Sequence, residues 1–215
     1  MPYTGEVTPG GPPAVRELDA LTITKVSVGP MDNNAYLLCC RRTGEKLLID
    51  AANEAPRLLA LVGAGLATVV TTHRHQDHWM ALAEVIAATG ARPVAHAADA
   101  AELPVPAETV ADGATVTVGG SHLEVIHLVG HTPGSIALLY PDPAGVAHLF
   151  TGDSLFPGGP GRTTDPADFA SLMDDLAEKI FGRLPDDTWF YPGHGRDSTL
   201  GRERPAIGQW RARGW

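Results

Sequence analysis

The chain has 215 residues, of which 44% are hydrophobic and 19% charged, a length and composition that favour one globular domain with a sizeable core. Its 16 basic and 25 acidic side chains give a formal net charge of −9, and no basic block stands out, so nucleic acid is not an expected partner. No apolar run approaches the roughly 20 residues that a membrane helix requires, and no secretory signal is visible. We therefore expect a cytoplasmic protein that does not bind membranes.

The first segment, residues 1–20, begins with many prolines and glycines and is expected to be a loosely ordered leader. A single domain is expected at 21–215. Its only cysteines, Cys39 and Cys40, are adjacent in the sequence, and a disulfide between neighbours is strained. We expect both to be reduced, as is usual for cytoplasmic proteins.

Short strands and a few helices are predicted along the domain. Alternating apolar and polar residues, or short apolar runs bounded by turn residues, predict strands at 21–28, 35–40, 46–50, 67–72, 93–95, 114–118, 123–128, 135–140, 146–150 and 188–191. Capping residues around periodic apolar segments predict helices at 54–62 with Asn53 as cap, from Asp77 or His78 to Thr89, and at 165–181. Two groups of strands separated by helices indicate an α+β sandwich.

The densest chemical signal is the segment TTHRHQDH, Thr71–His78, at the end of an apolar strand. On a helix, His73 and His75 would point about 200° apart, since each residue turns the helix by about 100°. In an extended loop they project to the same side. Asp77 and His78 then begin the next helix and can point into the same cleft. Imidazole and carboxylate are ligands that zinc accepts, so the pattern predicts a metal site.

Three further segments offer a ligand beside a glycine, which allows the backbone to turn sharply. They are GHTPGS with His131, TGDSLF with Asp153 and YPGHG with His194, and each follows an apolar strand. A catalytic zinc takes three protein ligands and leaves one position open, so the four candidates in Thr71–His78 are too many for one ion and too few for two. We expect all seven side chains to converge in space.

Together, these four motifs resemble those of the metallo-β-lactamase-fold hydrolases, in the glyoxalase II-like branch. The resemblance implies a four-layer αββα sandwich with a dinuclear metal site along one edge. It assigns one ion to a first ligand group (His73, His75 and His131) and another to a second ligand group (Asp77, His78 and His194). Asp153 would bridge both ions, and Asp77 would also be catalytic. The two divalent ions are expected to be zinc, with iron or manganese as alternatives, and to share a hydroxide that attacks a carbonyl.

Two other residues match family positions outside the ligand set. Asp50, at the end of a predicted strand, corresponds to an aspartate that orients a ligand. Arg162 corresponds to a basic residue that meets an anionic group of the substrate. The resemblance departs from glyoxalase II where Pro160 and Arg196 replace a cysteine and an aromatic residue, and we do not expect the helical domain that grips glutathione. We therefore expect a small-molecule substrate, the thioester of some small thiol.

Other activities of the same fold remain as alternatives. A persulfide dioxygenase would use one iron held by His73, His131 and Asp153, a set of two histidines and a carboxylate with open positions for oxygen. A lactonase would use the same seven ligands. A β-lactamase is disfavoured because Asp153 occupies the position of its zinc-binding cysteine or serine, and a nuclease is disfavoured by the lack of basic surface. The complete second ligand group favours hydrolysis over dioxygenation.

Overall fold

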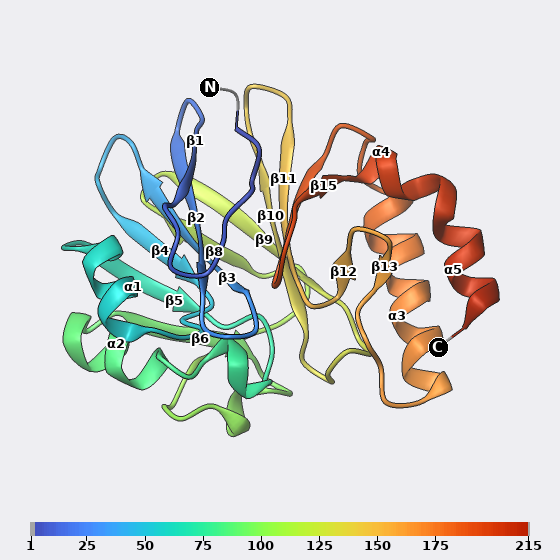
Figure 1. Ribbon diagram of the computed structural model, residues 1–215, viewed down its shortest axis with the longest axis horizontal. Helices are drawn as coiled ribbons and strands as arrows, with labels where there is room; N and C mark the ends of the chain where they lie inside the picture. Colours follow the sequence, from blue (N-terminus) through green and yellow to red (C-terminus); the bar gives the residue numbers. More distant parts are fainter. Residues whose placement is uncertain (1–2, 215) are drawn as a thin grey trace.

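The computed structural model describes residues 3–214, and within them the strands form two large sheets packed face to face (Figure 1). The first sheet has the order β1-β2-β3-β4-β5-β6-β7. Its strands are β1 (Ala14–Glu17), β2 (Leu21–Val28), β3 (Asn33–Cys40), β4 (Lys46–Ile49), β5 (Leu66–Val70), β6 (Arg92–His96) and β7 (Glu108–Val110). Pairing is antiparallel from β1 to β4 and parallel from β4 to β7, so β4, β5 and β6 end at the same edge.

The second sheet has the order β15-β14-β11-β10-β9-β8. Its strands are β8 (Thr115–Val118), β9 (Ser121–His127), β10 (Ile136–Pro141), β11 (Ala147–Gly152), β14 (Trp189–Pro192) and β15 (Ser198–Thr199). Only the β11–β14 pair in this sheet is parallel, among the residues that the structure describes. The strands β9, β11 and β14 therefore run in the same direction and also end at one edge. A short hairpin of β12 (Leu155–Phe156) and β13 (Gly159–Pro160) follows β11.

Helices cover the outer face of each sheet (Figure 1). The helices beside the first sheet are α1 (Ala55–Val62) and α2 (Leu82–Thr89), with short 3-10 turns η1 (Gln76–His78) and η2 (Ala100–Glu102). Beside the second sheet lie α3 (Pro166–Asp175), which continues as the π-helical segment η3 (Leu176–Phe181), then α4 (Leu200–Glu203), the turn η4 (Arg204–Ala206) and α5 (Ile207–Arg213). No helix within residues 3–214 is both long enough and apolar enough to cross a membrane.

Three apolar clusters hold these layers together. The central cluster lies between the sheets and includes Leu38 from the first and Phe150 from the second. A second cluster packs α1 and α2 on the first sheet, through residues such as Leu58 and Leu82. A third packs α3 and α5 on the second sheet and includes Trp210. The predicted four-layer αββα sandwich is confirmed, and the predicted strands match observed ones to within two residues at either end.

The segment expected to be a loose leader differs from that expectation where the structure describes it. Residues 14–17 form β1, which pairs antiparallel with β2 and places Ala14 opposite Lys25. Tyr3 donates a hydrogen bond from its hydroxyl to Asp197 Oδ2 at 3.0 Å. The segment is ordered because it extends the first sheet through β1 and contacts the second sheet through Tyr3, since Asp197 lies between β14 and β15. Residues 1 and 2 of the expected leader, and residue 215 of the expected domain, lie outside the described residues.

One predicted helix start and one predicted helix cap are wrong. The helix expected from Asp77 or His78 begins at Leu82, because the backbone N–H groups of Met80 and Ala81 donate to the carbonyls of Ala52 and Ala51 rather than within a helix. Asn53 does not cap α1, since its side chain accepts from the adjacent Glu54 N–H at 2.7 Å. By contrast, the helix predicted at 165–181 is observed as α3 and η3, and the Asp165 side chain caps it by accepting from the N–H groups of Ala167 and Asp168. The two cysteines are free, as expected.

Candidate metal centre

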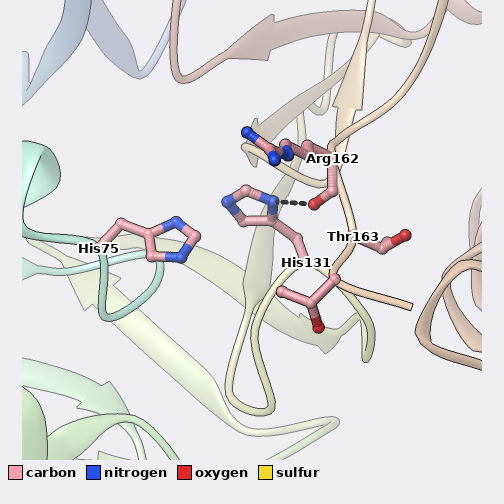
Figure 2. A pocket seen from close by; sticks show the side chains of 5 residues that line it. His75, His131, Arg162 and Thr163 are labelled. Atoms are coloured by element: carbon pink, nitrogen blue, oxygen red, sulfur yellow. Dashed lines mark hydrogen bonds between the residues drawn. The ribbon is translucent and has the colours of Figure 1, made fainter. Parts of the chain in front are cut away.

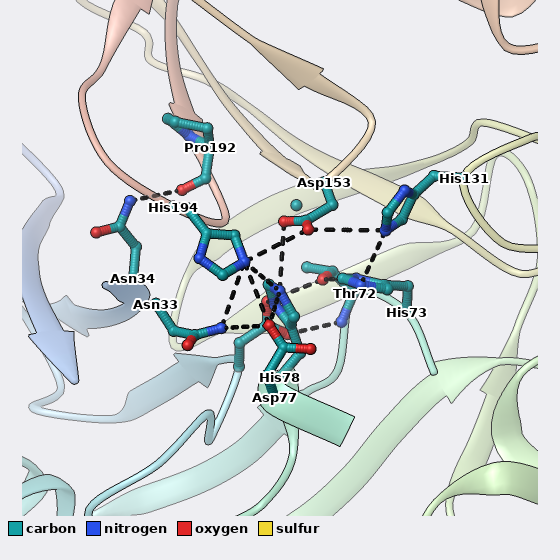
Figure 3. Close-up of polar contacts among 12 residues, drawn as sticks. Asn33, Asn34, Thr72, His73, Asp77, His78, His131, Asp153, Pro192 and His194 are labelled. Atoms are coloured by element: carbon teal, nitrogen blue, oxygen red, sulfur yellow. Dashed lines mark hydrogen bonds and ion pairs between the residues drawn. The ribbon is translucent and has the colours of Figure 1, made fainter. Parts of the chain in front are cut away.

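The seven predicted ligand side chains lie together where the two sheets present their strand ends. Figure 3 shows them except for His75, which Figure 2 shows beside His131. His73 and His75 follow β5, and Asp77 and His78 lie on η1. His131, Asp153 and His194 follow β9, β11 and β14, which end at the corresponding edge of the second sheet. Three subsets have potential ligand atoms within 4.8 Å of one another: His73, His75 and His131; His73, His78 and Asp153; and Asp77, His78 and His194. The predicted convergence across more than half of the chain is confirmed.

Asp153 lies between the first and second ligand groups. Its Oδ2 is 3.7 Å from Nε2 of His131, which belongs to the first group. The same oxygen is 3.4 Å from His194 Nε2, and Oδ1 is 3.3 Å from His78 Nε2, both in the second group. Of the seven side chains, this carboxylate is in the position that the sequence resemblance assigned to a bridge.

The outer nitrogen atoms of four imidazoles are already engaged. Backbone carbonyls accept from Nδ1 of His131 (Arg162 O, 2.6 Å) and of His194 (Met31 O, 2.9 Å). Asp50 Oδ2 accepts from His78 Nδ1 at 2.8 Å, and Thr72 Oγ1 lies 3.0 Å from His73 Nδ1. An Nδ1 that carries the proton leaves Nε2 of a neutral imidazole with a free lone pair. When these rings are neutral, all four Nε2 atoms therefore present lone pairs to the centre of the cluster.

These inward-facing atoms fit a cation. His78 Nε2 lies 3.1 Å from His194 Nε2, and His73 Nε2 lies 3.3 Å from His131 Nε2. Asp153 Oδ1 is buried and accepts no hydrogen bond from any described residue. Lone pairs and a carboxylate oxygen at such distances repel unless a positive charge lies among them. Histidine and aspartate in this arrangement suit divalent metal ions, so the donor set of this structure fits metal binding.

The pKa values of the histidines also indicate that positive charge is stabilised at this centre. Burial would lower the pKa of His78, but the carboxylates of Asp153 and Asp50 raise it well above its ordinary value. Burial likewise opposes protonation of His194, whose hydrogen bonds with Asp153 and Asp77 raise its pKa to about 10. Burial lowers the pKa of His73 well below its ordinary value. Without a metal, protons on the second ligand group offset the carboxylates, so metal binding competes with protons there.

Asp50 lies behind the ligands. One of its carboxylate oxygens accepts from the Thr72 N–H, and the other accepts from the Thr72 hydroxyl, each at 2.8 Å. The second oxygen also accepts from His78 Nδ1. Asp50 is 2% exposed and has a positive φ of 58°, a backbone conformation that residues other than glycine rarely adopt. The contacts orient the His78 ring, which is the kind of role expected for Asp50.

A cavity of about 360 Å³ opens beside the first ligand group (Figure 2). It is lined by His75, His131, Arg162, Thr163 and Thr164. The carbonyl of Arg162 accepts from Nδ1 of the His131 ring, and the side chains of both residues line the cavity. Arg162 thus lines the cavity that adjoins the candidate ligands, where the family resemblance implies a residue that binds an anionic group of the substrate.

Three buried polar residues near this centre are not predicted from the sequence as part of the site. Asn33 Nδ2 donates to Asp77 Oδ2 at 2.8 Å. Asn34 Nδ2 donates to the carbonyls of Pro192 and Gly195, which flank the turn carrying His194. Lys25 Nζ also donates to the Gly195 carbonyl, at 2.7 Å. One signal was present in the sequence: Lys25 shares the apolar face of its predicted strand with Leu21 and Ile23.

The αββα sandwich and the histidine- and aspartate-rich cluster at its strand ends define a metal-binding protein of the sandwich type. More particularly, the chain belongs to the metallo-beta-lactamase superfamily, whose family model matches residues 28–194. A hydroxyacylglutathione hydrolase of Fuscovulum blasticum is 40% identical over 167 residues. That match covers 76% of this chain and 62% of the relative, so the chain spans less than two thirds of the relative's length.

Solved structures agree with this family. A metallo-beta-lactamase from Staphylococcus aureus subsp. aureus COL superimposes with a TM-score of 0.79 at 25% identity, covering 90% of this chain and 63% of that one. The protein TTHA1623, solved in a di-iron-bound form, has a TM-score of 0.71 at 31% identity, covering 84% of this chain and 96% of that one. The family resemblance inferred from the four motifs is therefore confirmed.

Proposed function

We propose that this protein is a metal-dependent hydrolase that cleaves the thioester of a small thiol. The observation that carries the proposal is the complete second ligand group, Asp77, His78 and His194, next to a complete first one. A hydrolase that uses two metal ions requires both groups, whereas a one-iron dioxygenase would require only His73, His131 and Asp153 and has no use for the second group. Similarity to proteins named hydroxyacylglutathione hydrolase supports a thioester as the substrate.

Each ligand group would hold one divalent ion, and Asp153 would contact both. Zinc is the first choice, with iron or manganese as alternatives, because histidine and aspartate suit all three. The di-iron form of TTHA1623 supports a pair of ions. Two such ions supply a hydroxide near neutral pH, by lowering the pKa of bound water toward about 7, and they stabilise negative charge on a carbonyl oxygen.

The chain's own residues would orient the reactants. The hydrogen bond with His194 lowers the pKa of Asp77 below its ordinary value, so this carboxylate stays ionised at neutral pH. Asn33 donates to Asp77 Oδ2, which holds the carboxylate in one orientation beside His194; the ionised carboxylate would accept a hydrogen bond from the nucleophile and so orient it. Asp77 would then be catalytic as well as a ligand.

The cavity would bind the substrate. A volume of about 360 Å³ suits a small molecule, and the Arg162 guanidinium would pair with an anionic group of it. Loss of this charge should raise KM more than it lowers kcat, because the contact is made equally in the ground state and the transition state. Replacement of Arg162 by Gln should therefore weaken the use of anionic thioesters more than neutral ones.

The decisive experiment measures metal content and a panel of substrates. Protein purified without added metal is analysed for zinc, iron and manganese, then assayed with thioesters, lactones and thiol persulfides, with and without oxygen. We expect about two ions per chain and thioester cleavage that proceeds without oxygen. One tightly held iron, with oxygen consumed in step with persulfide loss and no thioesterase activity, would establish the dioxygenase instead. Selective cleavage of lactones would identify a lactonase.

A further inference from the structure

One buried carboxylate near the centre belongs to neither ligand group. Asp99 lies just after β6, directly before η2, and is 1% exposed. Its Oδ2 accepts from the Arg74 N–H at 2.9 Å and from the Thr132 hydroxyl at 2.5 Å. Its Oδ1 accepts from the Gly134 N–H at 2.9 Å. Three donors thus surround the carboxylate.

The three donors come from the two loops that carry the first ligand group. Arg74 stands between His73 and His75 in the loop after β5, which belongs to the first sheet. Thr132 follows His131 in the loop between β9 and β10, which belongs to the second sheet. A single side chain therefore connects the loops of two different sheets, at the point where their histidines meet.

The contacts are too close and too well buried to be incidental. Charge-assisted hydrogen bonds to a carboxylate are stronger than neutral ones, and a buried carboxylate without donors would be costly. Gly134 allows the approach, because a Cβ added there would lie 2.6 Å from Asp99 Cγ. The Thr132 hydroxyl is also within 2.7 Å of Ser135 Oγ, which fixes the donor further. This arrangement sets the spacing of the two loops.

We propose that Asp99 is a positioning residue for the first metal ion. It holds the loop of His73 and His75 at a fixed distance from the loop of His131, so that the three imidazoles meet one ion without rearrangement. The inference rests on the metal site proposed above, but not on a thioester being the substrate. Replacing a side chain that holds a metal ligand in place typically lowers the protein's affinity for the metal by about 10–100-fold.

The test is the replacement Asp99→Asn. An amide can satisfy at most two of the three donors and turns its own N–H₂ toward the third. Wild type and variant are loaded with Co²⁺, and each ion's release to a competing chelator is followed by visible absorption and metal analysis. His131→Ala and His194→Ala supply reference spectra for loss of the first and second ion. We expect the first ion of the variant to be held about 10–100-fold more weakly, with the second ion close to wild type.

A matched control and a milder variant complete the design. Asp112 is an exposed aspartate that accepts the His127 N–H at 2.7 Å and touches neither ligand loop, so Asp112→Asn should retain both ions. Thr132→Val removes one donor with little change in shape and should weaken the first ion by a smaller factor. It keeps the inference testable if Asp99→Asn does not fold.

The outcomes separate cleanly. Wild-type retention of both ions, equal loss of both, or the same loss in Asp112→Asn would refute the positioning role. A wild-type protein without thioesterase activity would refute the proposed reaction, while selective loss of the first ion in the Asp99 variant would still support the inference.

Discussion

Replacement of Lys25 by methionine tests how the loop of His194 is supported. Lys25 and Asp197 form an ion pair of 2.6 Å whose side chains are both fully buried. Lys25 Nζ also donates to the carbonyls of Gly5 and Gly195, so all three of its protons are used. Methionine fills a similar volume but donates nothing. It leaves a buried carboxylate without its cation and two carbonyls with one donor fewer.

The expected loss of stability follows from these contacts. Removing one partner of a buried ion pair typically costs about 3–5 kcal/mol. Asp197 keeps donors from the Tyr3 hydroxyl and from Trp189 Nε1, at 3.0 and 3.1 Å, and burial already raises its pKa, so it can take up a proton. We therefore expect the lower end of the range, about 3 kcal/mol, which corresponds to a fall in Tm of roughly 6–12 °C for a domain of this size.

Urea unfolding of wild type, Lys25→Met and the double variant Lys25→Met/Asp197→Leu measures the effect. The m value should not change, because the same surface is exposed on unfolding. The double variant removes the unpaired charge and should recover most of the lost stability, since an apolar replacement of a buried pair is often neutral. A single variant within about 1 kcal/mol of wild type, or a double variant less stable than the single one, would refute this reasoning.

Three further predictions concern the centre and the core. Asp153→Ala should abolish hydrolysis and loosen both metal ions, whereas His75→Ala should mainly weaken the first; wild-type metal content in either variant would disprove the ligand assignment. Gly193→Ala should lower metal content without altering a ligand, because its Cβ would lie 2.1 Å from Asp153 Oδ1, while Gly208→Ala, with nothing within 4 Å, serves as control. Burial, together with the positive charge of Arg16, lowers the pKa of the fully buried His148 to about 4. Between pH 6.5 and 4 the unfolded chain therefore binds more protons at this residue than the folded chain does. The free energy of unfolding should therefore fall by up to about 3 kcal/mol as the pH drops through that window, and His148→Gln should make this free energy depend less on pH. The same pH dependence in wild type and variant would show that His148 is not its cause.

The ligand residues could be predicted from the sequence because their signal is local. Four ligands, His73, His75, Asp77 and His78, stand close together after an apolar strand, and the other three, His131, Asp153 and His194, each stand beside a glycine. Asp99 offers no such signal, since its donors lie 25 to 35 positions away and an aspartate in a turn is ordinary. Asn33 is similar, with its partner Asp77 44 positions distant. Ligands can thus be recognised by chemistry, whereas the residues that hold them depend on which loops the fold brings together.

The boundaries of helices and strands can likewise be predicted where the signal is local, and not where distant contacts set them. Strand 21–28 is predicted without error because its alternation matches burial against the opposite sheet. The helix predicted from Asp77 or His78 begins four or five residues later, at Leu82, because the carbonyls of Ala51 and Ala52 accept from backbone N–H groups that a helix would otherwise use. The edge strand β1 is not predicted from the sequence. Two of its four side chains are exposed and none is fully buried, so the segment has no apolar pattern typical of a strand.

The hydrogen bonds around the His194 turn also bear on the order in which the chain folds. The strands of the first sheet all precede those of the second in the sequence, so the first sheet can form while later residues are still being synthesised. The bonds from Tyr36 to Pro192 and from Tyr3 to Asp197, however, span 156 and 194 positions. Contacts of such separation close large loops and form slowly. We therefore expect the metal centre to be completed as a late step of folding, after both sheets exist, rather than to act as a nucleus for them.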